Sequence, residues 1–142
     1  MKKILIINAN YYEEISLSLV KSAKKFLIKN KIKLSIINVP GVFEIPISIR
    51  KYIKKYDGFI ALGCVIKGET PHFDLICSST FDSILKISVD FNKPIGNGII
   101  TAFNINQAKV RASLTGSSLK PNKGLEAAKA VISVLKNEPK KT

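Results

Sequence analysis

Four short, mainly apolar runs, each followed by an amphipathic segment, constrain the fold of this chain more than any other feature. The runs cover residues 4–7, 34–39, 59–66 and 94–101. A strand that is apolar throughout, rather than at alternate positions, is buried on both faces, which is typical of a parallel sheet covered by helices. We therefore expect a four-stranded parallel sheet with helices on both sides.

The segments that follow the runs have helical periodicity. Residues 13–29 place Ile15, Leu19, Ala23 and Leu27 along one stripe. Similar patterns predict helices over residues 45–56, 71–90, 106–112 and 121–136. Strand and helix alternating along the chain predict a flavodoxin-like, three-layer α/β/α sandwich. We expect residues 1–142 to form a single domain whose last few residues are disordered.

Composition and charge exclude several classes of protein. Hydrophobic residues make up 46% of the chain, which is too much for an intrinsically disordered protein. The net charge of +13 would suit a nucleic-acid-binding protein, but only Arg50 and Arg111 among the 23 basic residues are arginines. Arginine is the residue that reads bases and grips phosphates bidentately. Lys, Ile and Asn have A/T-rich codons, so we interpret the excess of lysine as a compositional bias of the genome.

The sequence also lacks signals for export, membranes and metals. No apolar run approaches the length needed to cross a bilayer, and the N-terminal run is too short for a signal peptide. We expect a cytoplasmic protein. Cys64 and Cys77 have no metal-ligand spacing, and no Walker loop or dinucleotide motif is present. We therefore expect buried structural thiols and no metal site.

The segment after the third apolar run carries the strongest chemical signal. Ligands of doubly wound sheets bind outside the carboxyl ends of the strands. Thr70 is a good N-cap, Pro71 suits the first helical position, and Gly68 permits a tight turn before them. Free amides at this turn and helix start would bind a phosphate or another anion.

His72 is the single histidine of the chain and falls in the first turn of that predicted helix. The positive end of the helix dipole disfavours imidazolium there. Our hypothesis is a neutral imidazole that passes a proton in either direction near neutral pH. A surface histidine at a helix start is the alternative, and the residues alone do not separate the two.

Four further residues have both a functional and a structural interpretation. Glu44 could bind a polar ligand or only favour the first turn of its helix, and Tyr11 could stack on a flat ring or only be exposed. Arg111 fits a solvated helix face, and Lys123 fits a surface charge beside a helix cap. On spacing alone, the structural interpretations of Glu44 and Arg111 are favoured.

Four segments resemble a known family: VPGVFEIP at residues 39–46, ALGCVIKGETPHFD at 61–74, QAKVRA at 107–112 and NKGLEAA at 122–128. In their order and spacing they are similar to 6,7-dimethyl-8-ribityllumazine synthase, and the resemblance runs from residue 4 to residue 135. It implies condensation of 5-amino-6-(D-ribitylamino)uracil with 3,4-dihydroxy-2-butanone 4-phosphate, the penultimate step of riboflavin biosynthesis, with release of phosphate and water. It also implies a flavodoxin-like fold and no cofactor.

The resemblance assigns residue roles as well. His72 would transfer protons. The phosphate of the substrate would be held by Glu69, Thr70, Arg111 and Lys123. The pyrimidine and ribityl groups would be lined by Tyr11, Val42, Phe43, Glu44, Cys64, Val65, Ile66 and Asn97. Two positions depart from the family pattern: Tyr11 lies in Asn-Tyr-Tyr rather than Arg-Phe-Asn, and Asn97 stands where many members have an aromatic residue.

The resemblance further implies a homopentamer, or an assembly of pentamers, with active sites between neighbouring subunits. Riboflavin synthase is its candidate partner, and the size of the assembly is open. The alternative is a catalytically weak shell or scaffold protein of the same fold that binds polyanions through its lysine-rich surface.

Overall fold

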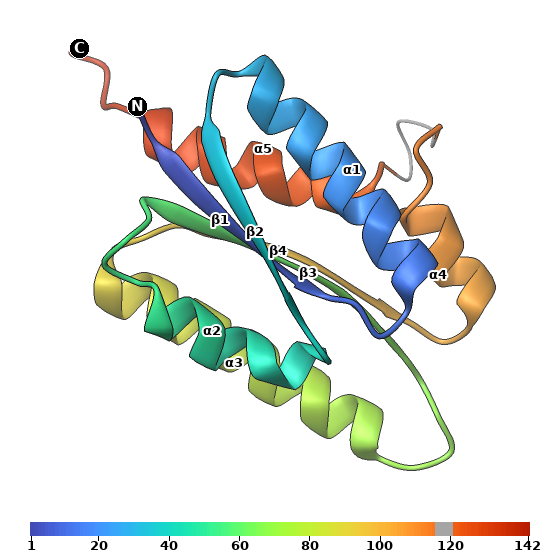
Figure 1. Ribbon diagram of the computed structural model, residues 1–142. Helices are drawn as coiled ribbons and strands as arrows, with labels where there is room; N and C mark the ends of the chain where they lie inside the picture. Colours follow the sequence, from blue (N-terminus) through green and yellow to red (C-terminus); the bar gives the residue numbers. More distant parts are fainter. Residues whose placement is uncertain (116–120) are drawn as a thin grey trace.

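The four apolar runs form a single parallel sheet in the part of the chain that the computed structural model describes, residues 1–115 and 121–142 (Figure 1). The strands are β1 (Lys3–Ala9), β2 (Lys33–Val39), β3 (Gly58–Ile66) and β4 (Ile95–Ala102). Their order across the sheet is β2-β1-β3-β4, so that β2 and β4 are the two edges.

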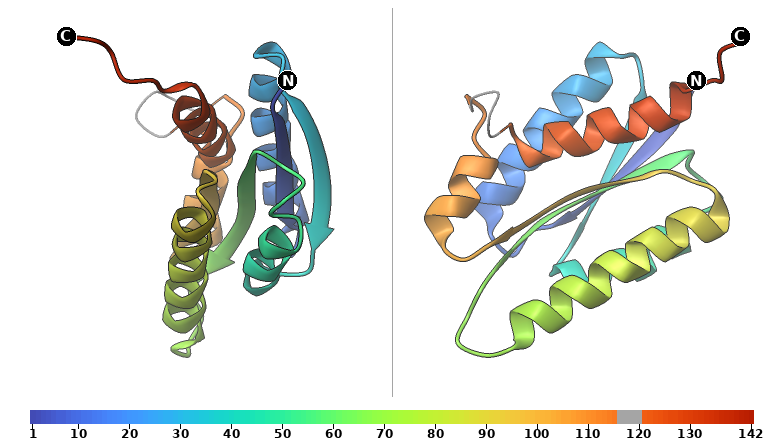
Figure 2. Two further views of the ribbon diagram at one scale, coloured as in Figure 1. Left: turned by 90° about the vertical axis from the view of Figure 1, so that its left-hand side faces the viewer. Right: turned by 180° about the vertical axis from the view of Figure 1, so that it is seen from behind.

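Helices cover both faces of this sheet (Figures 1 and 2). One face carries α1 (Glu13–Lys29), α4 (Ile105–Arg111) and α5 (Lys123–Lys136). The other face carries the short 3-10 turn η1 (Val42–Glu44), α2 (Ile45–Lys51) and α3 (His72–Phe91). The arrangement confirms the expected three-layer, flavodoxin-like α/β/α sandwich.

The central strand β1 shows why its sequence is continuously apolar. Ile4 and Ile6 belong to the core beneath α1 and α5, whereas Leu5 and Ile7 belong to the core beneath α2 and α3. All four side chains are almost completely buried. Alternate residues of a strand point to opposite faces, so a strand covered on both sides must be apolar at every position.

The second helix differs from the prediction, since α2 ends at Lys51 rather than continuing to residue 56. The chain after Lys51 tightens into turns, in which the amide of Ile53 donates to the carbonyl of Arg50. The ammonium of Lys93 donates to the carbonyl oxygens of Ile53 at 2.6 Å and Tyr56 at 2.7 Å. A lysine about forty residues away along the chain thus satisfies two carbonyls of the segment that follows α2.

The remaining helices lie close to their predicted bounds, with α1 beginning and ending at the predicted residues. The loop expected between residues 113 and 121 falls largely outside the described residues. No helix within the described ranges is long and apolar enough to cross a membrane.

Candidate functional site

The carboxyl ends of β1, β2 and β3 surround a pocket of about 450 Å³, as the rule for parallel sheets predicts. We call it the His72 pocket. It is lined by Ala9, Tyr11, Tyr12, Gly41, Val42, Phe43, Glu44, Cys64, Val65, Ile66, His72 and Ile76. Eight of the residues assigned by the resemblance therefore lie together, although they come from four separate segments of the chain.

Two aromatic rings are presented at this pocket with much of their surface free. Tyr11 is 74% exposed and Phe43 is 62% exposed. The half-buried ring of Tyr12 meets that of Tyr11 edge-on, with the ring centroids 5.0 Å apart and the planes at 79°. Edge-to-face packing holds Tyr11 while leaving its ring available to stack on a flat ligand.

Burial keeps two acidic groups of the pocket protonated near neutral pH. It raises the pKa of the Cys64 thiol to about 11. It also raises the pKa of the Tyr12 phenol, with smaller contributions from Cys64 and Tyr11. A protonated thiol is a poor nucleophile, and Cys64 forms part of the apolar wall of the pocket. Histidine is the side chain that exchanges protons most readily near neutrality, and His72 is the histidine of this pocket.

The loop that delivers His72 is attached to the neighbouring loop after β4. The amide of Lys67 donates to the carbonyl of Ala102 at 2.9 Å, and the Lys67 ammonium lies 5.4 Å from the centre of the Phe103 ring. The rings of Phe73 and Phe103 are 6.5 Å apart. These contacts tie the residues on both sides of His72 in the sequence to the loop after β4.

The start of α3 differs from the prediction by one residue. Pro71 takes the cap position and His72 is the first helical residue, while the Thr70 hydroxyl accepts a hydrogen bond from the His72 amide at 3.4 Å. Gly68 does not have a positive φ, and a Cβ atom added there would meet no other atom. The backbone therefore does not require glycine at this position, contrary to the expected tight turn.

A second pocket, of about 310 Å³, lies along the edge strand β4. We call it the Arg111 pocket. It is lined by Phe81, Asn97, Ile99, Ile100, Thr101, Arg111, Pro121, Lys123 and Glu126. The Lys123 ammonium lies 3.5 Å from the Glu126 carboxylate, and the Asn97 side chain accepts a hydrogen bond from the Ile99 amide at 3.1 Å.

One buried residue, Asn122, links the two helices that carry the cations of the Arg111 pocket. Its side-chain oxygen accepts from the amides of Gly124 at 2.8 Å and Leu125 at 3.2 Å, so Asn122 is the N-cap of α5. Its side-chain nitrogen donates to the carbonyl of Ala112 at 2.9 Å, directly after the end of α4. The predicted cap is therefore confirmed, and it joins the helix that ends with Arg111 to the helix that begins with Lys123.

The predicted site residues thus fall into three places on a single chain. The His72 pocket and the Arg111 pocket are separate, and Asn97 lies in the second one. Glu69 and Thr70 are exposed in the loop before α3 and line neither pocket. Four residues of the His72 pocket were not among the predicted site residues: Ala9, Tyr12, Gly41 and Ile76. Ile76 follows His72 by one helical turn, so helical spacing could have indicated it.

No group of three or more His, Cys, Asp or Glu side chains within residues 1–115 and 121–142 could hold a metal ion.

Comparison with known proteins agrees with this geometry. A model of the 6,7-dimethyl-8-ribityllumazine synthase family matches residues 1–138. The 6,7-dimethyl-8-ribityllumazine synthase of Bartonella bacilliformis is 39% identical, over 94% of this chain and 90% of that protein. The enzyme of Campylobacter jejuni is 41% identical, over 94% of this chain and 87% of that protein. The enzyme of Novosphingobium aromaticivorans is 39% identical, over 95% of this chain and 95% of that protein. The chain belongs to the 6,7-dimethyl-8-ribityllumazine synthase family.

Proposed function

We propose that this protein is a transferase that condenses 5-amino-6-(D-ribitylamino)uracil with 3,4-dihydroxy-2-butanone 4-phosphate. The products are 6,7-dimethyl-8-ribityllumazine, phosphate and water, in the penultimate step of riboflavin biosynthesis. The family match supports this reaction. The observation that carries the proposal is the His72 pocket, in which one histidine, two free aromatic rings and one carboxylate meet at the ends of three strands.

The pocket suits the pyrimidine substrate. The free face of Tyr11 stacks on the uracil ring, and the Glu44 carboxylate accepts hydrogen bonds from the polar groups of the ring or the ribityl chain. The apolar wall of Val42, Cys64 and Ile66 excludes water from the reacting amine. Alignment of two substrates supplies much of the rate in a condensation of this kind.

His72 transfers the protons that the reaction requires. The amine attacks the ketone, and the resulting carbinol must gain a proton on its oxygen before water leaves. The hydroxyl-bearing carbon then loses a proton as the neighbouring carbon–oxygen bond to phosphate breaks, and ring closure at the hydroxyl-bearing carbon expels a further water molecule. A single imidazole that accepts and returns a proton serves these steps in turn, because histidine titrates near neutrality.

The phosphate group is bound by the loop before α3 together with the cations of the Arg111 pocket. Glu69 and Thr70 lie in that exposed loop, where the free amides of the first turn of α3 attract an anion. Gly68 has open space where a Cβ would be, which permits close approach of the phosphate to its backbone. Arg111 supplies a bidentate, charge-assisted contact, and Lys123 adds a second positive charge.

We infer that a neighbouring copy of the chain supplies the cations of the Arg111 pocket to each active site. Arg111, Lys123 and Asn97 line a pocket at one edge of the sheet, whereas His72 lies at the ends of β1, β2 and β3. One chain therefore carries two half-sites, and two chains side by side complete one site. The exposed apolar side chains of α2 and α3 support such contacts; they are Ile47, Leu75, Leu85 and Val89. We propose a homopentamer or an assembly of pentamers.

The cysteines indicate the compartment in which the protein acts, and the product of the reaction indicates a partner. Both cysteines are free thiols, which suits a reducing compartment such as the cytoplasm. The lumazine product needs an enzyme that consumes it, so riboflavin synthase is the candidate partner.

Incubation of the purified protein with both substrates tests the proposal, with formation of the fluorescent lumazine as the readout. We expect catalytic turnover and one phosphate released per lumazine formed. Absence of product, combined with salt-sensitive binding of RNA, would instead support the scaffold alternative. The intact set of His72, Glu69, Thr70 and Arg111 favours the enzyme.

A further inference from the structure

The edge strand β2 presents backbone groups that no other strand of the described chain uses. β2 pairs with β1 alone. The amide of Lys33 donates to the carbonyl of Lys2, and the carbonyl of Val39 accepts from the amide of Asn10. In a parallel pair, alternate residues direct their N–H and C=O groups to opposite sides. The backbone groups that face away from β1 are therefore those of Leu34, Ile36 and Asn38.

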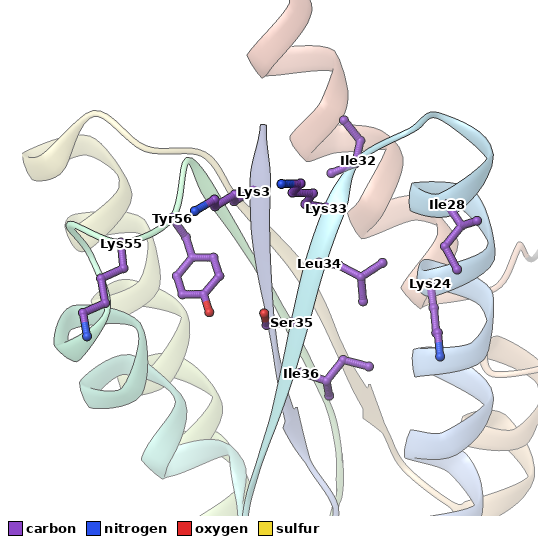
Figure 3. A pocket seen from close by; sticks show the side chains of 10 residues that line it. All are labelled: Lys3, Lys24, Ile28, Ile32, Lys33, Leu34, Ser35, Ile36, Lys55 and Tyr56. Atoms are coloured by element: carbon purple, nitrogen blue, oxygen red, sulfur yellow. The ribbon is translucent and has the colours of Figure 1, made fainter. Parts of the chain in front are cut away.

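An open hollow of about 1030 Å³ surrounds this edge, and Figure 3 shows the side chains that line it. The strand runs through the middle of the hollow. Lys24 and Ile28 of α1 lie on one side, and Lys55 and Tyr56 lie on the other. The hollow is separate from both pockets of the proposed active site, because it shares no lining residue with either.

Apolar surface is exposed along the middle of the hollow. Ile36 is 38% exposed and Ile28 is 57% exposed. Figure 3 shows the side chains of Leu34 and Ile36 on the side of β2 that faces α1. The centre of β2 therefore offers both a row of free backbone groups and an apolar strip beside it.

The rim of the hollow is positively charged. Its lining includes the exposed residues Lys3, Lys24, Lys33 and Lys55 but no Asp or Glu. The nearby carboxylate of Asp57 accepts a hydrogen bond from the Lys3 amide at 2.8 Å. A ligand that carries carboxylates is thus attracted from every side of the hollow.

We propose that the edge of β2 binds an extended, acidic peptide segment of another protein, which adds to the sheet as a further strand. Its backbone pairs with Leu34, Ile36 and Asn38. Its apolar side chains pack on Ile28 and Ile36, and its carboxylates meet the lysines of the rim. The interaction is independent of the proposed condensation, because it uses no residue of the two active-site pockets.

Charge and hydrogen bonding favour an acidic peptide over a second copy of the chain and over a nucleic acid. A second copy of the chain would bring two sets of rim lysines together between molecules that each carry a charge of +13. A nucleic acid would neutralise the lysines but would leave the strand edge and the apolar strip without partners. Natural sheets often protect an edge with lysine. In β2, however, the only lysine is its first residue, Lys33, and residues 34–37 are mostly apolar.

Binding of a labelled peptide to the full-length, assembled protein tests the proposal. The probe alternates glutamate with valine over seven residues, the length of β2. We expect saturable binding by fluorescence anisotropy that weakens as salt is added. The double reversal Lys24→Glu and Lys33→Glu should lower the affinity about tenfold or more, whereas the matched control Lys129→Glu, on the exposed face of α5, should change it by less than about twofold.

A second experiment separates strand addition from simple charge attraction. A probe with N-methylated amides at alternate positions keeps its charge but loses half of its backbone donors. We expect its affinity to fall about tenfold. Ile36→Pro removes one outward N–H of β2 without touching a bond to β1 and should have a similar effect, with Ile36→Val as its control.

Three results would overturn the proposal. The first is no binding of the probe at low salt. The second is that the methylated probe and an oligonucleotide of the same charge both bind as tightly as the unmodified probe. This result would indicate a general polyanion surface. The third is self-association that the probe and the Lys24→Glu, Lys33→Glu variant both disrupt, which would indicate a second copy of the chain at this edge.

Discussion

At the scale of single residues, His72 is the group that the proposed mechanism uses for proton transfer. Replacing it removes a proton shuttle but leaves the substrates aligned by the rest of the pocket. We expect His72→Ala to lower kcat by about tenfold to a hundredfold, with little change in KM for either substrate. Steady-state kinetics across pH 6 to 8 provide the measurement. An unchanged kcat over this range would exclude a catalytic role for His72.

Arg111 is expected to act through binding rather than through proton transfer. Loss of a charge-assisted contact to phosphate should raise KM for the butanone phosphate by about thirtyfold in Arg111→Ala, with a smaller change for the pyrimidine. Arg111→Lys keeps the charge without the bidentate geometry, so it should recover part of the affinity. If Arg111→Ala bound the phosphate substrate as well as the unaltered protein does, its assignment would be wrong.

Cys64 gives a test of the electrostatics of the His72 pocket. Because burial raises the pKa of this thiol to about 11, the reactive thiolate is scarce at neutral pH and becomes abundant only in strong alkali. We expect alkylation by iodoacetamide to stay slow through pH 8 and to rise towards pH 11, as followed by mass spectrometry of the folded protein. Urea-unfolded protein is the control and should react readily near pH 8.5, the ordinary range of cysteine.

The same shift has a consequence for stability. The folded state keeps the proton of Cys64 at a pH where the unfolded chain has lost it, so the contribution is complete below about pH 8.5 and is lost as the pH rises towards 11. If Cys64 were alkylated at pH 8 as fast in the folded protein as in the unfolded protein, the burial of this thiol would be contradicted.

At the scale of the elements, the close crossing of α1 and α5 leaves no room for a larger residue. A Cβ atom on Gly124, at the start of α5, would meet the backbone carbonyl oxygen of Leu19 in α1. Gly124→Ala should therefore push the two helices apart and lower the free energy of unfolding by about 2 kcal/mol or more. Gly68→Ala is the matched control, because its Cβ meets nothing, and should change stability by less than about 0.5 kcal/mol.

Unfolding in denaturant at one fixed protein concentration measures both variants. Equal unfolding midpoints for Gly124→Ala and the unaltered protein would show that α1 and α5 leave room for a methyl group at Gly124.

The local sequence pattern was enough to predict the bounds of most helices and strands. It failed where residues distant in the sequence are involved. The bounds of α1 follow from its own apolar stripe, and those of the four strands follow from their apolar runs to within one or two residues. The stripe over residues 45–56 does not reveal that α2 ends at Lys51. Beyond that end, Lys93 binds the carbonyls of Ile53 and Tyr56 from across the fold, a contact that no local pattern predicts.

The candidate site was predictable to a similar extent. The rule that ligands bind at the ends of parallel strands brings Tyr11, Glu44 and His72 to one edge of the sheet, and the His72 pocket lies there. The same rule cannot tell that Arg111 and Lys123 belong to a different pocket. Their position depends on α4, on α5 and on the buried amide of Asn122 between them.

At the scale of the whole molecule, the excess of positive charge divides into parts with different meanings. Ten of the 21 lysines lie within helices, and nine of these are exposed, which is typical of a lysine-rich composition. Arg111 and Lys123 form one local cationic pocket, and four lysines around the edge of β2 form another cationic surface. Neither cluster needs nucleic acid to explain it.

The proposed division of one chain into two half-sites leads to the central claim, that a complete active site forms between two copies. His72→Ala damages only the half that holds the pocket, and Arg111→Ala damages only the half that holds the cations. When the two variants share an assembly, some sites receive His72 from one chain and Arg111 from its neighbour. Such sites contain no substitution at all.

Activity of mixed assemblies is therefore the most direct measurement. The His72→Ala and Arg111→Ala chains are co-expressed in equal amounts with different affinity tags, and assemblies that carry both tags are purified. Random mixing leaves about a quarter of the sites intact, so we predict activity near a quarter of the unaltered protein and well above either variant alone. Activity no higher than the mean of the two separate variants would show that each chain carries its own complete site and would contradict the proposal.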